Sequence, residues 1–165
     1  MPRDSLNGVW ILDKNRVGWS MRGYLECLNV NELAIQAHEK GESEYDTYHT
    51  ISLDSSKVTI IKRSRVNNDL KVELEMGKEH VEYLKPENRP KKSIATSADG
   101  KTQLEIKSSL LTVNGMAHVV DKKFLEKEGD TTILVQELQI TNGQTRKSHK
   151  TTRYFLPFDG VLEAR

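Results

Sequence analysis

The stretch DLKVELEM, residues 69 to 76, alternates between apolar and charged side chains. Its apolar residues occupy every second position, at Leu70, Val72, Leu74 and Met76. Successive side chains of a strand point to opposite faces of a sheet. The segment is therefore predicted to be a strand with one face on a dry core and the other in water.

Segments of the same kind fill the chain from about residue 45 onward. They are short, rich in β-branched and aromatic residues, and often alternate with period two, which is typical of strands. Besides DLKVELEM they are YHTISL, KVTIIKRSRV, KKSIATS, KTQLEIKSSLL, AHVVDKKFL, TTILVQELQI and HKTTRYFL. Near the start of the chain, GVWIL at residues 8 to 12 reads as a first strand.

Tight turns separate several of these segments. The dipeptides Asp99-Gly100, Asn114-Gly115 and Asn142-Gly143 tolerate the positive φ of hairpin turns. We therefore expect consecutive strands to be neighbours, which makes the connectivity mostly an up-and-down meander.

Residues 17 to 40 break the strand pattern. Met21, Tyr24, Leu25 and Leu28 have the spacing of one helix face, and Leu33, Ala34 and Ala37 repeat it. This spacing predicts two short amphipathic helices, separated around residues 29 to 31.

One strand, two short helices and then about nine strands favour an all-β fold, a ten-stranded antiparallel up-and-down β-barrel (β-clam) with a helix-turn-helix lid. Closure removes exposed sheet edges. Ten strands make a barrel wider than the eight-stranded kind, so we expect a cavity inside. With no linker or repeat, residues 1–165 read as one domain with an extension at about residues 157–165.

The composition limits the classes of partner. The 25 basic residues nearly balance the 24 acidic ones, so no overall field attracts nucleic acid. A single cysteine, Cys27, excludes an internal disulfide and fits a reducing compartment. No apolar stretch approaches the roughly 18 residues that span a bilayer, and the start has no apolar leader core. The sequence predicts a soluble, cytoplasmic protein, with transient membrane contact as an open possibility and a monomer as the expected state.

Catalytic signals are weak. The sequence has no nucleophile elbow, phosphate loop or dinucleotide fingerprint. Its histidines lack the spacing of a zinc site, and they are His38, His49, His80, His118 and His149. We therefore predict no enzyme activity, no catalytic residue, no metal and no cofactor.

Several segments together carry a resemblance to a known family. MGKEHVEYLKPENRPKKSIATSADGK, residues 76 to 101, resembles a segment of the intracellular fatty-acid-binding proteins, which are lipocalin or calycin-like intracellular lipid-binding proteins. In this segment Arg89, Lys92 and Ser93 match in register. YLECLNVNELAIQAH, residues 24 to 38, is similar to the helix-turn-helix of that family, and Gly8-x-Trp10 to its first strand.

Arg153 and Phe155 resemble the Arg-x-Tyr pair with which the family holds a ligand carboxylate on its last strand. Phe155 replaces the tyrosine, so the phenolic hydroxyl is missing. A second inward cation of the family has two possible matches, Lys122 and Lys123. The resemblance implies a cavity that binds a hydrophobic carboxylate next to an internal arginine.

Arg153 by itself has two readings. A solvent-facing arginine needs no partner, and most arginines are exposed. An inward arginine is a buried charge at high cost, which a ligand carboxylate would neutralise. With the resemblance we favour the interior, with ordered water around Arg153 when no ligand is bound.

The predicted function is carriage of a long-chain fatty acid or similar hydrophobic carboxylate. Two alternatives remain open, namely a barrel that binds haem or modifies a lipid through His118 or His149, and a protein-interaction barrel with a filled interior. The predicted ligand-binding residues are Arg153, Phe155, Lys122, Tyr24, Met21, Leu25, Val30, Val72, Leu74 and Met76.

Overall fold

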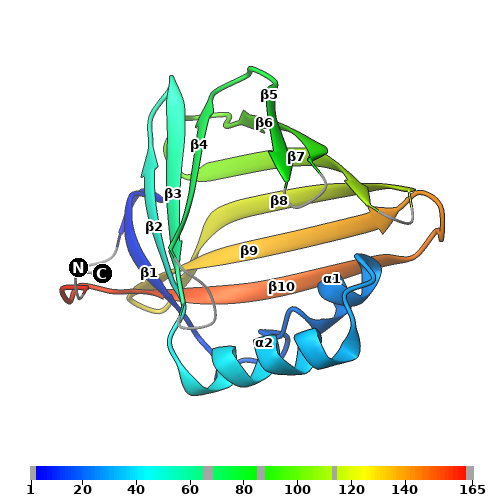
Figure 1. Ribbon diagram of the computed structural model, residues 1–165. Helices are drawn as coiled ribbons and strands as arrows, with labels where there is room; N and C mark the ends of the chain where they lie inside the picture. The colour runs from blue at the N-terminus through cyan, green and yellow to red at the C-terminus, as the bar shows by residue number, and fades with distance from the viewer. Residues whose placement is uncertain (1–2, 65–68, 85–87, 113–114, 163–165) are drawn as a thin grey trace.

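The computed structural model describes residues 3–64, 69–84, 88–112 and 115–162. They form one antiparallel sheet of ten strands in the order β4-β3-β2-β1-β10-β9-β8-β7-β6-β5 (Figure 1). The strands are β1 (Gly8–Leu12), β2 (Tyr48–Leu53), β3 (Lys57–Arg63), β4 (Leu70–Glu75), β5 (His80–Leu84), β6 (Arg89–Thr96), β7 (Gln103–Thr112), β8 (Gly115–Glu128), β9 (Thr131–Asn142) and β10 (Ser148–Pro157). The predicted barrel with its meander connectivity is confirmed.

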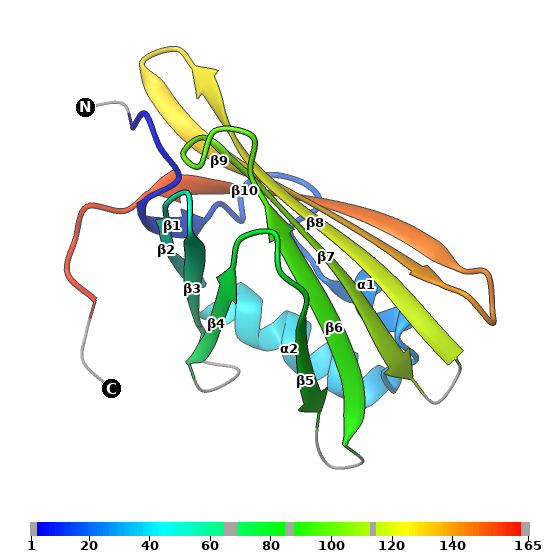
Figure 2. The same ribbon diagram turned by 90° about the horizontal axis from the view of Figure 1, so that it is seen from above.

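The barrel is not fully closed between β4 and β5. These two strands are the ends of the sheet, and they do not pair with each other. A bridge between Met76 and Ala95 spans the gap, and the Gly77 amide donates a hydrogen bond of 2.7 Å to the Ala95 carbonyl oxygen. Seen from above, β1–β4 face β6–β9 across the molecule, as in an opened shell (Figure 2).

Strand β5 is absent from the segments that the sequence predicts as strands. Its residues, HVEYL, lie within the segment 76 to 101 that carries the resemblance described above. In the structure β5 pairs with β6, and Val81 and Tyr83 are 40% and 64% exposed. An edge strand that is wet on both faces lacks the apolar alternation by which a strand is recognised.

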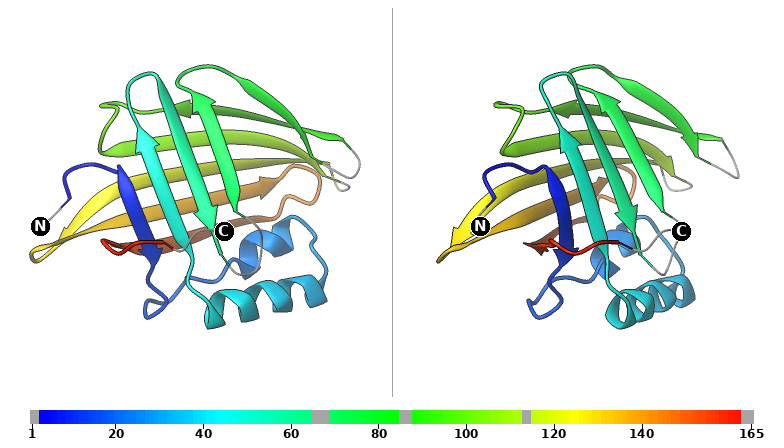
Figure 3. Two further views of the ribbon diagram at one scale, coloured as in Figure 1. Left: turned by 60° about the vertical axis from the view of Figure 1, so that its left-hand side comes forward. Right: turned by 90° about the vertical axis from the view of Figure 1, so that its left-hand side faces the viewer.

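Two helices form the lid, α1 (Arg22–Cys27) and α2 (Glu32–Glu44) (Figure 3). The Asn31 side chain caps α2 by accepting a hydrogen bond of 2.9 Å from the Ala34 amide. Helix α1 packs on β9 and β10. Helix α1 comes so close to β10 at Gly23 that a Cβ there would meet the ring of the exposed His149 at 2.3 Å, so a larger residue would require that side chain to move.

The prediction for the buried face of α2 is wrong. Leu33, Ala34 and Ala37 are exposed, while Ile35 and Glu42 are the buried residues of this helix. Ile35 and Glu42 are seven residues apart and therefore share a helix face. The helix is oriented by a buried carboxylate and its partners, because it offers only one large apolar side chain to the core.

The apolar core consists of two clusters. The larger one surrounds Trp10 and Phe155, which are fully buried, and Leu74, Val72 and Met76 pack in or against it. The smaller one consists of Cys27, Ala117 and Ile140, with Tyr24 and Leu28 of the lid against it. The alternation of DLKVELEM is confirmed from Val72 onward, whereas Leu70 at the start of the strand is 57% exposed.

The chain beyond β10 has no regular structure as far as residue 162. Phe158 holds its first part in place, since its amide donates to the Val9 carbonyl oxygen and its ring meets Tyr48 edge to face at 4.9 Å. Asn114 of the predicted Asn114-Gly115 turn and residues 163–165 lie outside the described residues. In the described part of the chain, no helix has the length and apolarity to cross a bilayer.

Candidate functional site

Arg153 points into the barrel. In β10 the side chains of Thr151, Arg153 and Phe155 are buried, and those between them are half-buried. Arg153 is only 5% exposed, and its guanidinium carbon lies 5.7 Å from the centre of the Phe155 ring. Arg153 is thus a buried charge, and the remaining question is what balances it.

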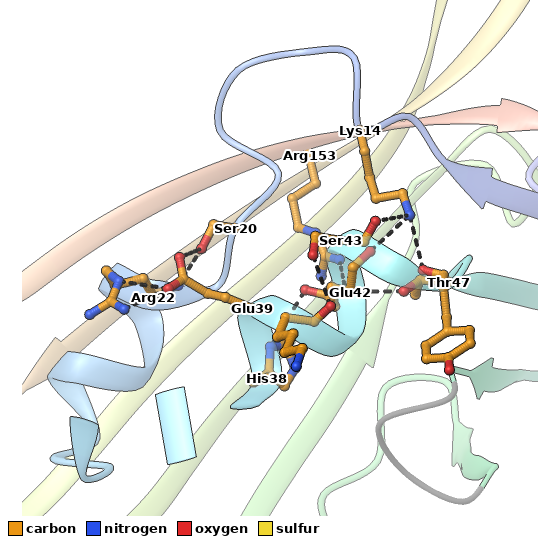
Figure 4. Close-up of polar contacts among 11 residues, drawn as sticks. Lys14, Ser20, Arg22, His38, Glu39, Glu42, Ser43, Thr47 and Arg153 are labelled. Atoms are coloured by element: carbon orange, nitrogen blue, oxygen red, sulfur yellow. Dashed lines mark hydrogen bonds and ion pairs between the residues drawn. The ribbon is translucent and has the colours of Figure 1, made fainter. Parts of the chain in front are cut away.

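Glu42 supplies that balance, which corrects the expectation of an unpaired arginine. Nη2 of Arg153 donates a hydrogen bond of 2.7 Å to Oε2 of Glu42, and both side chains are about 95% buried (Figure 4). Thr47 Oγ1 donates a second bond of 3.1 Å to the same oxygen. Burial lowers the pKa of Arg153, and the Glu42 carboxylate opposes that shift. The pair is an internal salt bridge between the lid and β10.

The second inward cation is Lys123. Lys122, which was placed among the ligand-binding residues, is exposed on the outer face of β8. The Lys123 side chain is 0% exposed and donates a hydrogen bond of 2.8 Å to Asp121 Oδ2. Gln136 on β9 donates to both oxygens of Asp121, at 3.2 and 3.3 Å. The alternative of Lys123 is thus correct in position, because strand pairing fixes which of the two lysines faces inward.

A third cation, Lys62, enters the interior from β3. It shares a face with the fully buried Val58 and Ile60, and it lies opposite the buried His49 of β2. Burial and then the charge of Lys123 lower the pKa of Lys62 from 10.5 to about 8, while Asp121 opposes them. The ammonium group of Lys62 makes no ion pair or hydrogen bond with any residue that the structure describes.

His49 is neutral at pH 7. Burial is the main cause that lowers its pKa well below 6.5, and the charges of Lys62, Lys123 and Arg153 act in the same direction. The centre of its ring lies 4.6 Å from the centre of the Phe155 ring. His49 therefore adds a polar ring but no charge to the interior.

These groups form one layer, which we call the polar layer. It lies between the two apolar clusters. Its members come from β2 and β3, from β8, β9 and β10, and from α2 of the lid. Burial raises the pKa of Asp121, but Lys123 and Lys62 outweigh it and hold that pKa below 3.8. Three cations thus face two carboxylates. The members are Glu42, His49, Lys62, Asp121, Lys123, Gln136 and Arg153.

The remaining predicted residues lie around this layer. Leu74 is buried, and Val72 and Met76 pack against the larger cluster. Tyr24 packs on the smaller cluster. Burial, followed by the charge of Asp121, raises its pKa to about 12, so its hydroxyl stays protonated. Met21, Leu25 and Val30 are half-buried in the lid and belong to neither cluster.

The barrel interior is not uniformly filled. Val72, Ser108, Leu110 and Val119 point inward by the alternation of their strands, yet each keeps part of its surface accessible. An inward side chain with accessible surface must face open space. Most of these side chains are apolar, so the space beside the polar layer suits an apolar ligand group.

Two hollows elsewhere are less suitable. One of about 360 Å³ lies at the β6–β7 turn, and one of about 420 Å³ lies at the β4–β5 turn among charged side chains. The first is lined in part by Lys122 and Lys123, and neither includes Arg153, Glu42 or Lys62. His118 and His149, considered above as haem ligands or bases, are both exposed. The polar layer is therefore the candidate site.

The sequence-based prediction lacks five members of the polar layer, namely Glu42, His49, Lys62, Asp121 and Gln136. A signal existed for two of them, Lys62 and Glu42. Lys62 continues the period-two series of Val58 and Ile60, which places it on their face. Glu42 follows Ile35 by seven residues on a helix. Both signals were overlooked because a charged residue at a core position contradicts the usual apolar pattern.

The lowered pKa of Lys62 gives a test of its burial. Between pH 8 and 10.5 the unfolded chain binds more protons at this residue, so stability rises with pH in that window. The gap between 10.5 and about 8 corresponds to about 3 kcal/mol. We expect Lys62→Met to be more stable than the parent by up to that amount at pH 7, and equal to it near pH 10.5, in urea unfolding.

Lys57→Met is the matched control, because Lys57 lies on the outer face of β3 and is 56% exposed. We expect it to change stability by less than about 0.5 kcal/mol at either pH. A Lys62→Met protein that is less stable than the parent at pH 7 would show that Lys62 is well solvated.

Comparisons with known proteins agree with this fold. The chain matches no model of a known protein family, and no curated protein sequence is significantly similar to it. Among solved structures, apo lipid binding protein 8 of Caenorhabditis elegans has a TM-score of 0.69 at 19% identity, over 96% of this chain and 99% of that one. The fatty acid binding protein of Schistosoma mansoni in complex with arachidonic acid has a TM-score of 0.59 at 17% identity, over 94% and 98%.

A third neighbour, the fatty acid-binding protein from brain tissue of Drosophila melanogaster, has a TM-score of 0.62 at 19% identity, over 90% of this chain and 95% of that one. The coverage is nearly complete in both directions for all three structures. The chain thus shares the barrel and the helical lid of these three structures. At these identities the likeness establishes the fold.

Proposed function

We propose that this protein is a non-enzymatic carrier that binds a hydrophobic carboxylate, such as a long-chain fatty acid, inside the barrel. The observation that carries the proposal is the polar layer, in which three cations face two carboxylates. Lys123 and Arg153 are buried and Lys62 is half-buried, so the surplus positive charge is costly to leave unbalanced. A ligand with one carboxylate head group restores the balance.

The apolar tail of the ligand accounts for most of the affinity. Burial of a methylene group contributes about 0.8 kcal/mol, and the half-buried inward side chains of Val72, Leu110 and Val119 offer an apolar surface beside the polar layer. The head group then fixes the orientation of the ligand. Phe155 has no hydroxyl, so the cations alone hold the acid.

Two further observations support the proposal. The structural neighbours include a lipid binding protein and a fatty acid binding protein in complex with arachidonic acid. The single cysteine, Cys27, is buried at the end of α1, and burial raises its pKa, which makes it a weak nucleophile. A monomeric carrier in a reducing, cytoplasmic compartment fits these features.

The proposal predicts selectivity for an acid over its ester. Oleic acid and methyl oleate have the same tail, but only the acid makes charge-assisted hydrogen bonds to the cations of the polar layer. We expect the acid to bind more tightly by about 1–3 kcal/mol, the range for hydrogen bonds to charged groups. Calorimetric titration of the delipidated protein at pH 7 measures this difference.

Equal affinities for the acid and the ester would instead identify a carrier of neutral lipids. Absence of binding to either ligand would favour a protein-interaction barrel. A Soret band in protein purified from cells would favour the haem alternative.

A further inference from the structure

Glu42 is placed where a ligand carboxylate would have to go. It lies in the last turn of α2, and the helix face that it shares with Ile35 turns it inward. Its carboxylate is bonded to the Arg153 guanidinium by the contact of 2.7 Å (Figure 4). Any carboxylate that binds Arg153 from the barrel interior therefore competes with a carboxylate of the protein itself.

Glu42 does not satisfy all the hydrogen-bonding groups of Arg153. The pair has one hydrogen bond, from Nη2 to Oε2, and no described residue donates a hydrogen bond to Glu42 Oε1 or accepts one from Arg153 Nε. A guanidinium forms its strongest contacts with a carboxylate through two parallel bonds. A ligand carboxylate that accepts hydrogen bonds from both Nε and Nη2 therefore binds Arg153 more strongly than Glu42 does.

Resting on the function proposed above, we propose that Glu42 determines the head-group selectivity of the site by occupying Arg153 until a ligand carboxylate replaces it. Exchange of one carboxylate for another keeps Arg153 neutralised. The displaced Glu42 keeps its hydrogen bond from Thr47 and so stays beside the polar layer, where the ligand adds the charge that balances the third cation. A ligand with a neutral head group has no means of displacing Glu42 and leaves the pair intact.

The exchange also acts on the lid. The end of α2 is held by Lys14, whose Nζ donates to the carbonyl oxygens of Glu42 at 2.8 Å and Tyr45 at 3.0 Å, and by the bond from Thr47 to Glu42. Arg153 is the contact that ties this turn to β10. An acid that displaces Glu42 therefore loosens the last turn of α2, while its ester does not.

Glu42→Gln tests the proposal, since it removes the competing charge and keeps the shape of the side chain. We expect Glu42→Gln to bind oleic acid about tenfold more tightly than the parent and methyl oleate with an affinity within about twofold of it. Titration calorimetry of delipidated protein measures both.

Glu39→Gln is the matched control. Glu39 lies on the same helix, and its hydrogen bonds to Arg22 and Ser20 also join the two ends of the lid, but it does not touch Arg153. We expect Glu39→Gln to leave both affinities unchanged. An equal gain in Glu39→Gln, or a gain of Glu42→Gln for the ester as well, would show that a looser lid is the cause and would overturn the proposal.

A second measurement uses the parent protein and does not depend on the folding of a variant. We expect oleic acid to speed amide hydrogen exchange at residues 43 to 47 and methyl oleate to leave it unchanged. Slower or unchanged exchange with bound acid contradicts the displacement of Glu42.

The outcomes separate the two proposals. If the parent prefers the acid and Glu42→Gln behaves like the parent, the carrier function stands and the role of Glu42 fails. If no form of the protein binds either ligand, both fail.

Discussion

Arg153→Leu is expected to destabilise the ligand-free protein by about 3–5 kcal/mol. The substitution removes the counter-charge of Glu42, whose side chain is 4% exposed, and a buried ion that loses its partner costs about this much. If Arg153 lacked a partner, the same change would be neutral or stabilising. Urea unfolding of delipidated protein at pH 7 separates these outcomes.

The double variant Arg153→Leu with Glu42→Leu identifies the cause. It removes both charges, and apolar replacement of a whole buried pair is often neutral or stabilising. We expect it to recover most of the lost stability while it still binds oleic acid more weakly than the parent. A double variant that is as unstable as Arg153→Leu would mean that lost packing is responsible.

Lys150→Leu provides the control on the outer face of β10. Lys150 forms an ion pair of 3.1 Å with Glu137, and its side chain is 57% exposed. Surface pairs of this kind contribute about 0–1 kcal/mol. An Arg153→Leu protein that loses no more stability than Lys150→Leu contradicts the burial of the Arg153–Glu42 pair.

Asp121→Asn is expected to cost about 3–5 kcal/mol at pH 7 as well. Asp121 pairs with Lys123, whose side chain is fully buried, and it also lies near Lys62. The asparagine leaves these cations without their carboxylate, which is the unfavourable case of a broken buried pair. Urea unfolding gives the loss, and we expect added oleic acid to restore part of it because a ligand carboxylate supplies the missing charge.

The pH dependence of this loss follows from the pKa of Asp121. That pKa lies below 3.8 in the folded protein. The carboxylate therefore stabilises the fold fully above pH 3.8, and this contribution is lost as the pH falls through the folded pKa. We expect the difference between the parent and Asp121→Asn to shrink in that acidic window.

Asp46→Asn is the control for Asp121→Asn, because it changes an exposed aspartate that lies 3.9 Å from Lys14. We expect less than about 1 kcal/mol of change. A difference between parent and Asp121→Asn that persists unchanged at pH 3 would show that the charge of Asp121 is not the cause.

The sequence by itself determined the barrel. Alternation such as that of Val72, Leu74 and Met76 assigns one face of a strand to the core, and this pattern is local, so it is visible without knowledge of the neighbouring strands. The turn dipeptide Asp99-Gly100 fixes a hairpin in the same way. The alternation of β10 leaves the direction of Arg153 open, and only the resemblance to a known family favoured the interior.

Only the tertiary structure decided how the interior charges are balanced. The choice between Lys122 and Lys123 depends on the register of β8, because Val119 and Val120 are both apolar and leave the face ambiguous. Glu42 and Arg153 are 111 positions apart and meet only because α2 lies along the end of the barrel with the face of Ile35 and Glu42 inward. An ion pair joins residues that are close in space but can be far apart in the sequence. The packing of helices and strands sets their distance, and a local residue pattern does not determine that packing.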